Sequence, residues 1–160
     1  MLRNGEFIVK KICFVASTGG HFEQIMMLKP LMNKYHSFII TEKTSYKVSN
    51  KGEKIYYIKQ VNRNEARFIL KMLFNTLSSL NIFIKERPDI VISTGALTTI
   101  PMCIIAKLFR KKIIFIESFA KVNSPTLTGK LVYKFADEFY VQWYSMLNIY
   151  PKAIFKGGIY

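Results

Sequence analysis

Hydrophobic residues along this chain fall into two patterns, short continuous runs and longer stretches with helical spacing. The short runs are rich in Ile, Val, Phe and Tyr, which is typical of strands buried on both faces of a parallel sheet. We predict such strands at residues 11–17, 37–41, 54–58, 89–93, 112–117 and 138–142.

The longer stretches predict helices, and nearly every one follows a predicted strand. They cover residues 22–34, 64–86, 99–109 and 126–135, with a short helical turn at 143–148. Pro88 and Asp89 are expected to end the longest helix, because proline cannot continue a helix. This alternation predicts one α/β domain over residues 1–160, a Rossmann-like open parallel sheet with helices on both faces. Its ligand crevice is expected beyond the carboxyl ends of the strands.

Three predicted strands end in small or polar residues that could hold a ligand at this edge. The first ends in Ser17-Thr18-Gly19-Gly20-His21, where two glycines permit a tight turn and the start of the next helix favours a phosphate. His21 is also the side chain best suited to proton transfer near neutral pH. The other two are Ser93-Thr94-Gly95-Ala96 and Glu117-Ser118. Each alone is equally a simple turn, but the carboxyl ends of parallel strands meet at one edge.

Known cofactor motifs do not fit these junctions. A dinucleotide fingerprint needs a third glycine after the adjacent pair, and the lysine of an ATP-binding loop is also missing. His21, His36 and two cysteines are too few for a zinc site, so we expect no metal. Cys13 and Cys103 lie in apolar runs and are expected to be reduced core thiols, which indicates a reducing compartment.

The chain is strongly basic, with 24 Lys and Arg residues against 10 Asp and Glu and a net charge of +14. Such a charge favours a polyanionic partner, which is a nucleic acid or an anionic membrane. The basic residues are scattered rather than gathered in a tail, and a nucleic-acid recognition motif is missing. We therefore expect an anionic membrane surface and no nucleic acid.

The predicted helix at 64–86 carries apolar residues over more of its surface than a helix packed on a sheet needs. A long buried core helix would show the same composition, but the net charge favours a helix that dips into anionic lipid. The sequence shows no apolar signal-peptide core and no uninterrupted apolar span of about 20 residues, so we expect peripheral membrane binding. The residues expected to face the membrane are Phe74, Phe83, Lys71, Lys85 and Arg87.

Four motifs, taken in order, resemble a known family. They are Ser-Thr-Gly-Gly-His at 17–21, Arg-Pro-Asp-Ile-Val-Ile-Ser-Thr-Gly-Ala at 87–96, Ile-Glu-Ser at 116–118 and Lys-Gly-Gly-Ile-Tyr at 156–160. The chain is similar to PssD/CpsF-type glycosyltransferase subunits of bacterial exopolysaccharide and capsule synthesis. These subunits are akin to the membrane-recruiting subunit of the eukaryotic two-chain dolichol-diphosphate N-acetylglucosaminyltransferase. More distantly, the chain resembles the N-terminal half of the enzyme that adds N-acetylglucosamine to lipid I.

The resemblance implies the N-terminal, acceptor-side half of a GT-B glycosyltransferase that is split over two chains. A separate partner would bind the UDP-sugar donor. This chain would bind a polyprenyl-diphosphate-sugar acceptor, as a cytoplasmic protein peripheral to the inner face of the plasma membrane. The transfer would be inverting and need no metal or resident cofactor, with His21 as general base and Glu117 as second candidate or orienting group. The residues expected to bind the acceptor and its diphosphate are Ser17, Thr18, Gly19, Gly20, Thr94, Gly95, Ala96 and Ser118.

The sequence departs from the lipid I enzyme at two points, a first loop with fewer glycines and Ile116, which stands where that enzyme has a histidine. An alternative function is a self-contained nucleotide-binding module with the same Rossmann-like fold. A basic nucleic-acid-binding domain is a third. Tight binding of a nucleotide sugar by the isolated chain would favour the module, whereas dependence on a second chain would favour the split enzyme.

Overall fold

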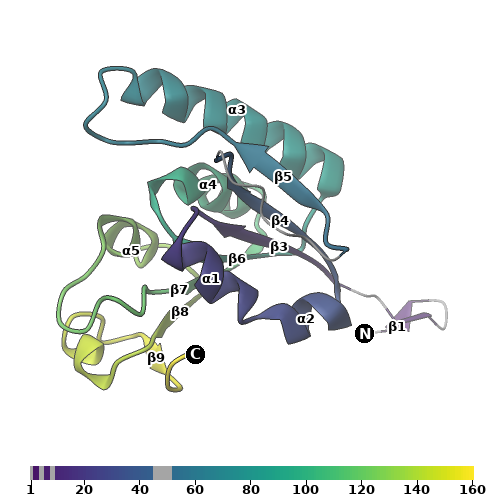
Figure 1. Cartoon of the computed structure of the whole chain (residues 1–160). Helices are drawn as coiled ribbons and strands as arrows, with labels where there is room; N and C mark the ends of the chain where they lie inside the picture. The colour runs from purple at the N-terminus through teal and green to yellow at the C-terminus, as the bar shows by residue number, and fades with distance from the viewer. Residues whose placement is uncertain (1, 4–5, 8–9, 45–51) are drawn as a thin grey trace.

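Seven parallel strands form one open sheet in the computed structural model, which describes residues 2–3, 6–7, 10–44 and 52–160 (Figure 1). Their order across the sheet is β5-β4-β3-β6-β7-β8-β9. A separate antiparallel pair, β1 (Leu2–Arg3) and β2 (Glu6–Phe7), precedes the sheet. The strands of the sheet are β3 (Lys11–Ala16), β4 (His36–Glu42), β5 (Ile55–Ile58), β6 (Ile90–Gly95), β7 (Lys112–Ile116), β8 (Glu138–Val141) and β9 (Ile154–Phe155).

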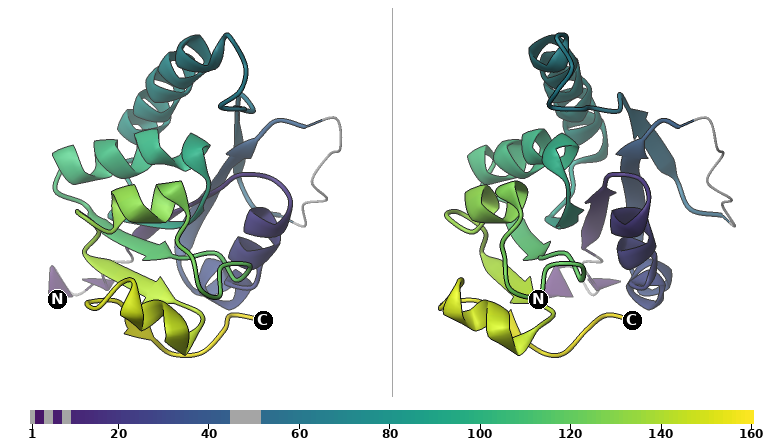
Figure 2. Two further views of the ribbon diagram at one scale, coloured as in Figure 1. Left: turned by 90° about the vertical axis from the view of Figure 1, so that its left-hand side faces the viewer. Right: turned by 60° about the vertical axis from the view of Figure 1, so that its left-hand side comes forward.

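Helices cover both faces of this sheet. One face carries α1 (Gly20–Met26) and α2 (Lys29–Lys34), and the other carries the remaining α-helices (Figure 2). These are α3 (Phe68–Glu86), α4 (Ile100–Leu108) and α5 (Leu127–Val132), with 3-10 turns η1 (Leu97–Thr99) and η2 (Tyr144–Asn148). The predicted α/β fold is therefore confirmed.

The core has two parts because successive side chains of a strand point to opposite faces. Val15 and Phe115 belong to the cluster beneath α3, α4 and α5. Phe14 and Ile39 belong to the cluster beneath α1, where they pack with Ile25. Central strands are thus buried on both faces, which explains why they are continuous apolar runs in the sequence.

Cys13 on β3 and Cys103 on α4 are buried free thiols, as predicted. Burial raises the pKa of both thiols, that of Cys103 to about 12. Both therefore stay protonated at neutral pH and serve as packing groups rather than nucleophiles.

The predicted elements all form, with two corrections. The predicted helix at 22–34 is wrong as one element, because it is two helices that meet at Met27 and Leu28. Pro30 lies in the first turn of α2, where its missing N–H and its ring interrupt a continuous helix. The sequence pattern also did not predict β1, β2 and β9, which are two-residue strands too short to show alternation.

The chain reverses direction across the sheet between β3 and β6. From β3 it continues to β4 on one side, whereas β6 pairs with β3 on the other side. In an open parallel sheet such a switch leaves a crevice at the carboxyl ends of the two strands. The backbone N–H of Ser17 donates to the carbonyl of Gly95 at 2.9 Å, so the chain just after β3 lies against the end of β6.

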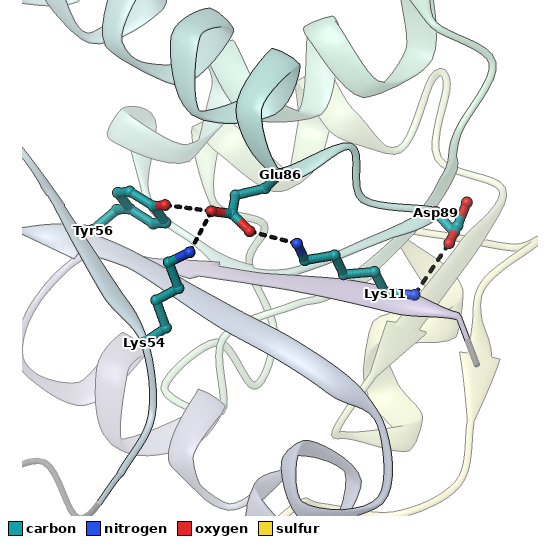
Figure 3. Close-up of polar contacts among 5 residues, drawn as sticks. All are labelled: Lys11, Lys54, Tyr56, Glu86 and Asp89. Carbon is teal, nitrogen blue, oxygen red and sulfur yellow. Dashed lines mark hydrogen bonds and ion pairs between the residues drawn. The ribbon is translucent and has the colours of Figure 1, made fainter.

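A charged cluster at the opposite edge fixes the end of α3 to the sheet (Figure 3). The buried carboxylate of Glu86 accepts hydrogen bonds from the ammonium groups of Lys11 and Lys54 and from the hydroxyl of Tyr56. The backbone N–H of Lys11 donates in turn to Asp89 at 3.1 Å. Burial opposes ionisation of Glu86, but the three hydrogen bonds outweigh burial and lower its pKa from 4.5 to about 2.

Glu86→Gln is expected to destabilise the fold more at pH 7 than at pH 3. One pKa unit corresponds to ~1.4 kcal/mol, so ionised Glu86 contributes about 3 kcal/mol of stability at neutral pH. That contribution is complete above the unfolded pKa of 4.5 and is lost as the pH falls through the folded value of about 2. Urea unfolding at both pH values should show the difference between wild type and variant shrinking by about half.

Glu65→Gln provides a matched control, because Glu65 forms an exposed pair with Lys71. Exposed pairs contribute about 0–1 kcal/mol, so this variant should differ little from wild type at either pH. A loss for Glu86→Gln that is equal at pH 7 and pH 3 would contradict the ionised cluster.

Candidate functional site

Two hydrogen bonds join His21, in the first turn of α1, to Thr94, near the end of β6. Nδ1 of His21 lies 2.5 Å from the carbonyl oxygen of Thr94, and the hydroxyl of Thr94 donates to the carbonyl of His21 at 2.8 Å. A carbonyl oxygen only accepts, so Nδ1 carries the proton of the neutral ring. The lone pair of the neutral ring is then on Nε2, which makes Nε2 the atom that accepts a proton. The half-buried ring is therefore held in the tautomer of a general base.

The glycines that precede His21 form an exposed turn at the start of α1. Gly19 has φ 68°, a left-handed value that favours glycine, and its carbonyl accepts from the N–H groups of Phe22 and Glu23. The space around the missing side chains of Gly19 and Gly20 is open to at least 4 Å. The turn thus leaves backbone accessible to a ligand beside the imidazole.

Gly95, the last residue of β6, lies against the ring of His21. Its φ is 97°, and a Cβ atom there would lie 3.1 Å from Cε1 and 3.3 Å from Nδ1 of His21. The predicted residues Ser17, Thr94 and Gly95 are therefore brought together with His21, and Ala96 follows in the same loop.

Gly95→Ala is expected to displace the imidazole and to strain the backbone. We expect kcat of the glycosyl transfer proposed below to fall about ten- to a hundredfold, the scale for a misplaced catalytic group. Gly52→Ala is the matched control, because Gly52 has φ 99° and nothing within 4 Å of its Cβ position. That variant should show only the ~1–3 kcal/mol of backbone strain in a thermal melt. Equal activity losses in both variants would contradict the specific contact with His21.

Glu42, the last residue of β4, is a buried carboxylate. It accepts from the N–H and hydroxyl of Thr18, at 3.4 and 3.2 Å, and from the N–H of Val61 at 3.2 Å. Among the ion pairs of the described residues none involves Glu42. This carboxylate therefore ties the glycine turn to the segment that leads into α3.

Glu117 and Ser118 follow directly after β7, and the Glu117 carboxylate is bound by groups outside this cluster. The Glu117 side chain is 1% exposed and accepts hydrogen bonds from Thr126, Tyr150 and the N–H of Ser118, at 2.8 to 3.2 Å. Burial and the bond to Glu117 raise the pKa of Tyr150, so its hydroxyl stays a donor. Because Thr126 also caps α5, the structure makes Glu117 an anchor for that helix. Its carboxylate faces α5 and Tyr150 rather than the glycine turn.

The outward side of α3 is an apolar surface, which we call the α3 face. Phe74 is 52% exposed, Leu73 57% and Leu77 56%. Phe83 is the exception among the predicted membrane-facing residues, because it is 4% exposed and its ring packs 4.9 Å from that of Phe109. The exposed apolar residues that define the α3 face are Ile69, Leu70, Leu73, Phe74, Leu77 and Ile84.

Cations border this surface at both ends. The ammonium of Lys59 lies 3.9 Å from the ring centre of Phe74, Lys71 is half-buried, and Lys85 and Arg87 are exposed near the end of the helix. In the part of the chain that the structure describes, α3 is the one helix long and apolar enough to cross a membrane, with 22% of that stretch buried. The sequence pattern predicted that this helix contacts lipid but did not predict a stretch long and apolar enough to cross a membrane.

Comparison with known proteins identifies the family. The family model described as "Oligosaccharide biosynthesis protein Alg14 like" matches residues 12–159. The chain belongs to the Alg14-like family. It is 29% identical to the UDP-N-acetylglucosamine transferase subunit ALG14 of Homo sapiens and 27% identical to that of Rattus norvegicus. Both alignments cover 92% of this chain and 82% of the relative. The expected assignment to glycosyltransferase subunits is thereby confirmed.

Solved structures confirm the fold. Acinetobacter baumannii MurG matches with a TM-score of 0.66 at 16% identity, over 85% of this chain and 42% of the MurG chain. UDP-N-acetylglucosamine 2-epimerase from Rickettsia bellii matches with a TM-score of 0.71 at 10% identity, over 94% of this chain and 45% of its own. The Alg14-like chain thus spans less than half the length of these two proteins.

Proposed function

We propose that this Alg14-like chain is the acceptor-side, membrane-recruiting subunit of a two-chain inverting glycosyltransferase. The donor is a UDP-sugar, and N-acetylglucosamine is the sugar in the names of the relatives. A separate partner chain binds the donor, and the acceptor is a polyprenyl-diphosphate-linked sugar. The observation that carries this proposal is the position of His21, whose Nδ1 is bound by Thr94 so that Nε2 can accept a proton. Its glycine turn is joined through Glu42 to the segment that leads into α3, whose outward side is apolar.

The glycine turn and the α3 face supply the two environments that such an acceptor needs. Glu42 links Thr18 of the turn to Val61, and the segment after Val61 enters α3. The exposed backbone of Gly19 and Gly20 suits a diphosphate, since backbone N–H groups at a helix start favour anions. The apolar α3 face suits the lipid surface in which the polyprenyl chain is dissolved.

The proposed reaction begins with the acceptor hydroxyl beside Nε2 of His21. Nε2 takes the hydroxyl proton as the oxygen attacks the anomeric carbon of the sugar, and the bond from that carbon to UDP breaks. The leaving diphosphate stays with the partner chain, where a helix start or cation stabilises its charge. Thr94 keeps Nδ1 protonated throughout, so Nε2 remains the site that receives the proton.

We propose that α3 lies in the plane of the membrane surface rather than crossing the bilayer. Its inner side is fastened to the sheet, since buried Asn75 accepts from the N–H of Lys59 at 2.9 Å and donates to its carbonyl at 2.7 Å. Glu86 fastens the other end of the helix through the charged cluster. Crossing the bilayer would break both attachments and bury Glu86 in lipid, whereas lying on the surface keeps them.

The finer setting that we propose is exopolysaccharide or capsule synthesis at the inner face of a plasma membrane, with the chain cytoplasmic and peripheral. The support is the resemblance of the motifs at 17–21, 87–96 and 116–118 to PssD/CpsF-type subunits. The net charge of +14 agrees with an anionic membrane surface.

Reconstitution tests this function directly. The full chain is combined with the donor-binding chain, UDP-N-acetylglucosamine and a polyprenyl-diphosphate-sugar in anionic liposomes, and the glycosylated lipid is measured. Product is expected only when both chains are present. Full transfer by this chain alone would overturn the split enzyme, and a partner whose rate is unaffected by this chain would overturn the subunit role.

A further inference from the structure

Two buried glutamines, Gln24 on α1 and Gln142 after β8, connect the last residues of the chain to the turn that carries His21. We propose that they are positioning residues, through which the segment at residues 156–160 sets the orientation of His21. The inference rests on the proposed function for its effect on the reaction. Its structural part concerns the isolated chain and can be tested there.

The connection is a continuous series of hydrogen bonds. The backbone N–H of Ile159 donates to Oε1 of Gln142 at 3.1 Å, and Nε2 of Gln142 donates to Oε1 of Gln24 at 2.7 Å. Nε2 of Gln24 then donates to the carbonyl of Gly20 at 3.3 Å. Gly20 directly precedes His21, so the series ends in the turn that holds the imidazole.

Each of the two amides has three hydrogen-bond partners in this arrangement. Nε2 of Gln142 also donates to the carbonyl of Glu117 at 2.8 Å, and Oε1 of Gln24 also accepts from the N–H of Phe119 at 3.0 Å. Both side chains are buried, and a buried amide that loses a partner pays the cost of an unsatisfied polar group. Moving Ile159 or Gly20 would therefore break a hydrogen bond of a buried amide, and the cost of that loss favours a single geometry of the series.

Residues 156–160 are also held by side-chain contacts, and Ile159 packs against the hydrophobic cluster beneath α1. Pairing of β9 with β8 ends at Phe155, and the residues beyond it are not part of a strand. The ring of Tyr160 lies 5.0 Å from that of Phe119, and a Cβ on Gly158 would lie 3.2 Å from the same ring. Phe119 itself donates to Gln24, so both routes from residues 156–160 converge on that glutamine.

The arrangement predicts a functional consequence. A molecule that binds or displaces residues 156–160 changes the distance between the N–H of Ile159 and Oε1 of Gln142. Gln24 then reorients against the carbonyl of Gly20, in the first turn of α1. The imidazole of His21 shifts with that turn relative to the carbonyl of Thr94. The position of residues 156–160 therefore affects the position of the proposed base.

The test uses the full chain and its two histidines. Imidazole NMR signals are recorded for wild type, Gln142→Met and Gln24→Met, and exposed His36 serves as an internal reference. Methionine keeps the shape of glutamine and removes its amide, and Gln60→Met is the matched control because Gln60 is exposed. We expect the His21 signals to move in the two buried variants, and neither histidine to move in Gln60→Met.

A second variant reaches the same series without changing either glutamine. Ile159→Pro removes the N–H donor at the chain end, and we expect it to move the His21 signals in the same sense as Gln142→Met. In the reconstituted enzyme, kcat of Gln142→Met should fall about ten- to a hundredfold with an unchanged KM for the UDP-sugar.

The outcomes separate the two proposals. His21 signals that stay in place in both Gln142→Met and Ile159→Pro would overturn the positioning role. Movement of His21 and His36 together would overturn it as well, because it would show a general loss of packing. Selective movement of His21 in a chain that supports no transfer with any partner would retain the positioning role and refute the proposed function.

Discussion

His21→Asn is expected to lower kcat of the reconstituted enzyme by ~10²–10⁴-fold, the usual contribution of general-base catalysis. The asparagine amide retains a donor for the carbonyl of Thr94 but offers no group that accepts a proton near neutral pH. The variant should fold normally, because the donor to the end of β6 is kept. Rates over a range of pH, with a thermal melt for each protein, are the measurements.

Two further results distinguish a base from a positioning group. The acid-side fall of kcat/KM that reports a titrating base in the free enzyme should be absent in His21→Asn. His21→Ala, which also removes the donor to Thr94, should lose stability as well as activity. A loss of only a few-fold in His21→Asn, with the pH profile intact, would assign proton transfer to another group.

Much of this site follows from the sequence because it depends on local patterns. Continuous apolar runs located the strands, and parallel strands bring their carboxyl ends to one edge. The meeting of Ser17 with Gly95 and of His21 with Thr94 therefore agrees with what the sequence predicts. Small residues at strand ends were sufficient to place these loops, although not to give the tautomer of His21.

The features that the sequence did not predict depend on the direction in which a side chain points and on contacts between residues far apart in the chain. Glu117, just after β7, is directed toward α5 by its bonds to Thr126, and composition alone does not reveal that direction. Phe83 and Phe74 are equally apolar, yet only the packing of α3 on α4 shows which of them is covered. Gln24 and Gln142 are 118 residues apart, so no local pattern reveals their contact.

Replacing two leucines of the α3 face is expected to abolish binding to anionic liposomes while leaving the fold intact. Leu73→Gln/Leu77→Gln changes residues 57% and 56% exposed, so little core packing is lost, and glutamine is a good helix former. Each buried leucine contributes about 1.5–3 kcal/mol on transfer from water, so the pair should lower the partition coefficient at least about a hundredfold. Liposome flotation at several lipid concentrations measures that coefficient.

The control and the salt dependence decide which surface meets the lipid. Met27→Gln/Leu31→Gln removes two exposed apolar residues from the opposite side of the sheet, so its flotation should match that of wild type. Higher salt should weaken wild-type binding without abolishing it, because screening acts on the attraction of the +14 charge and not on the buried leucines. Substitution of Phe83 is unsuitable here, since a charge at that buried site would disrupt the contact with Phe109. Unchanged flotation of Leu73→Gln/Leu77→Gln would show that a surface other than the α3 face binds the membrane. The proposed link between the glycine turn and a lipid-borne acceptor would then lose its support.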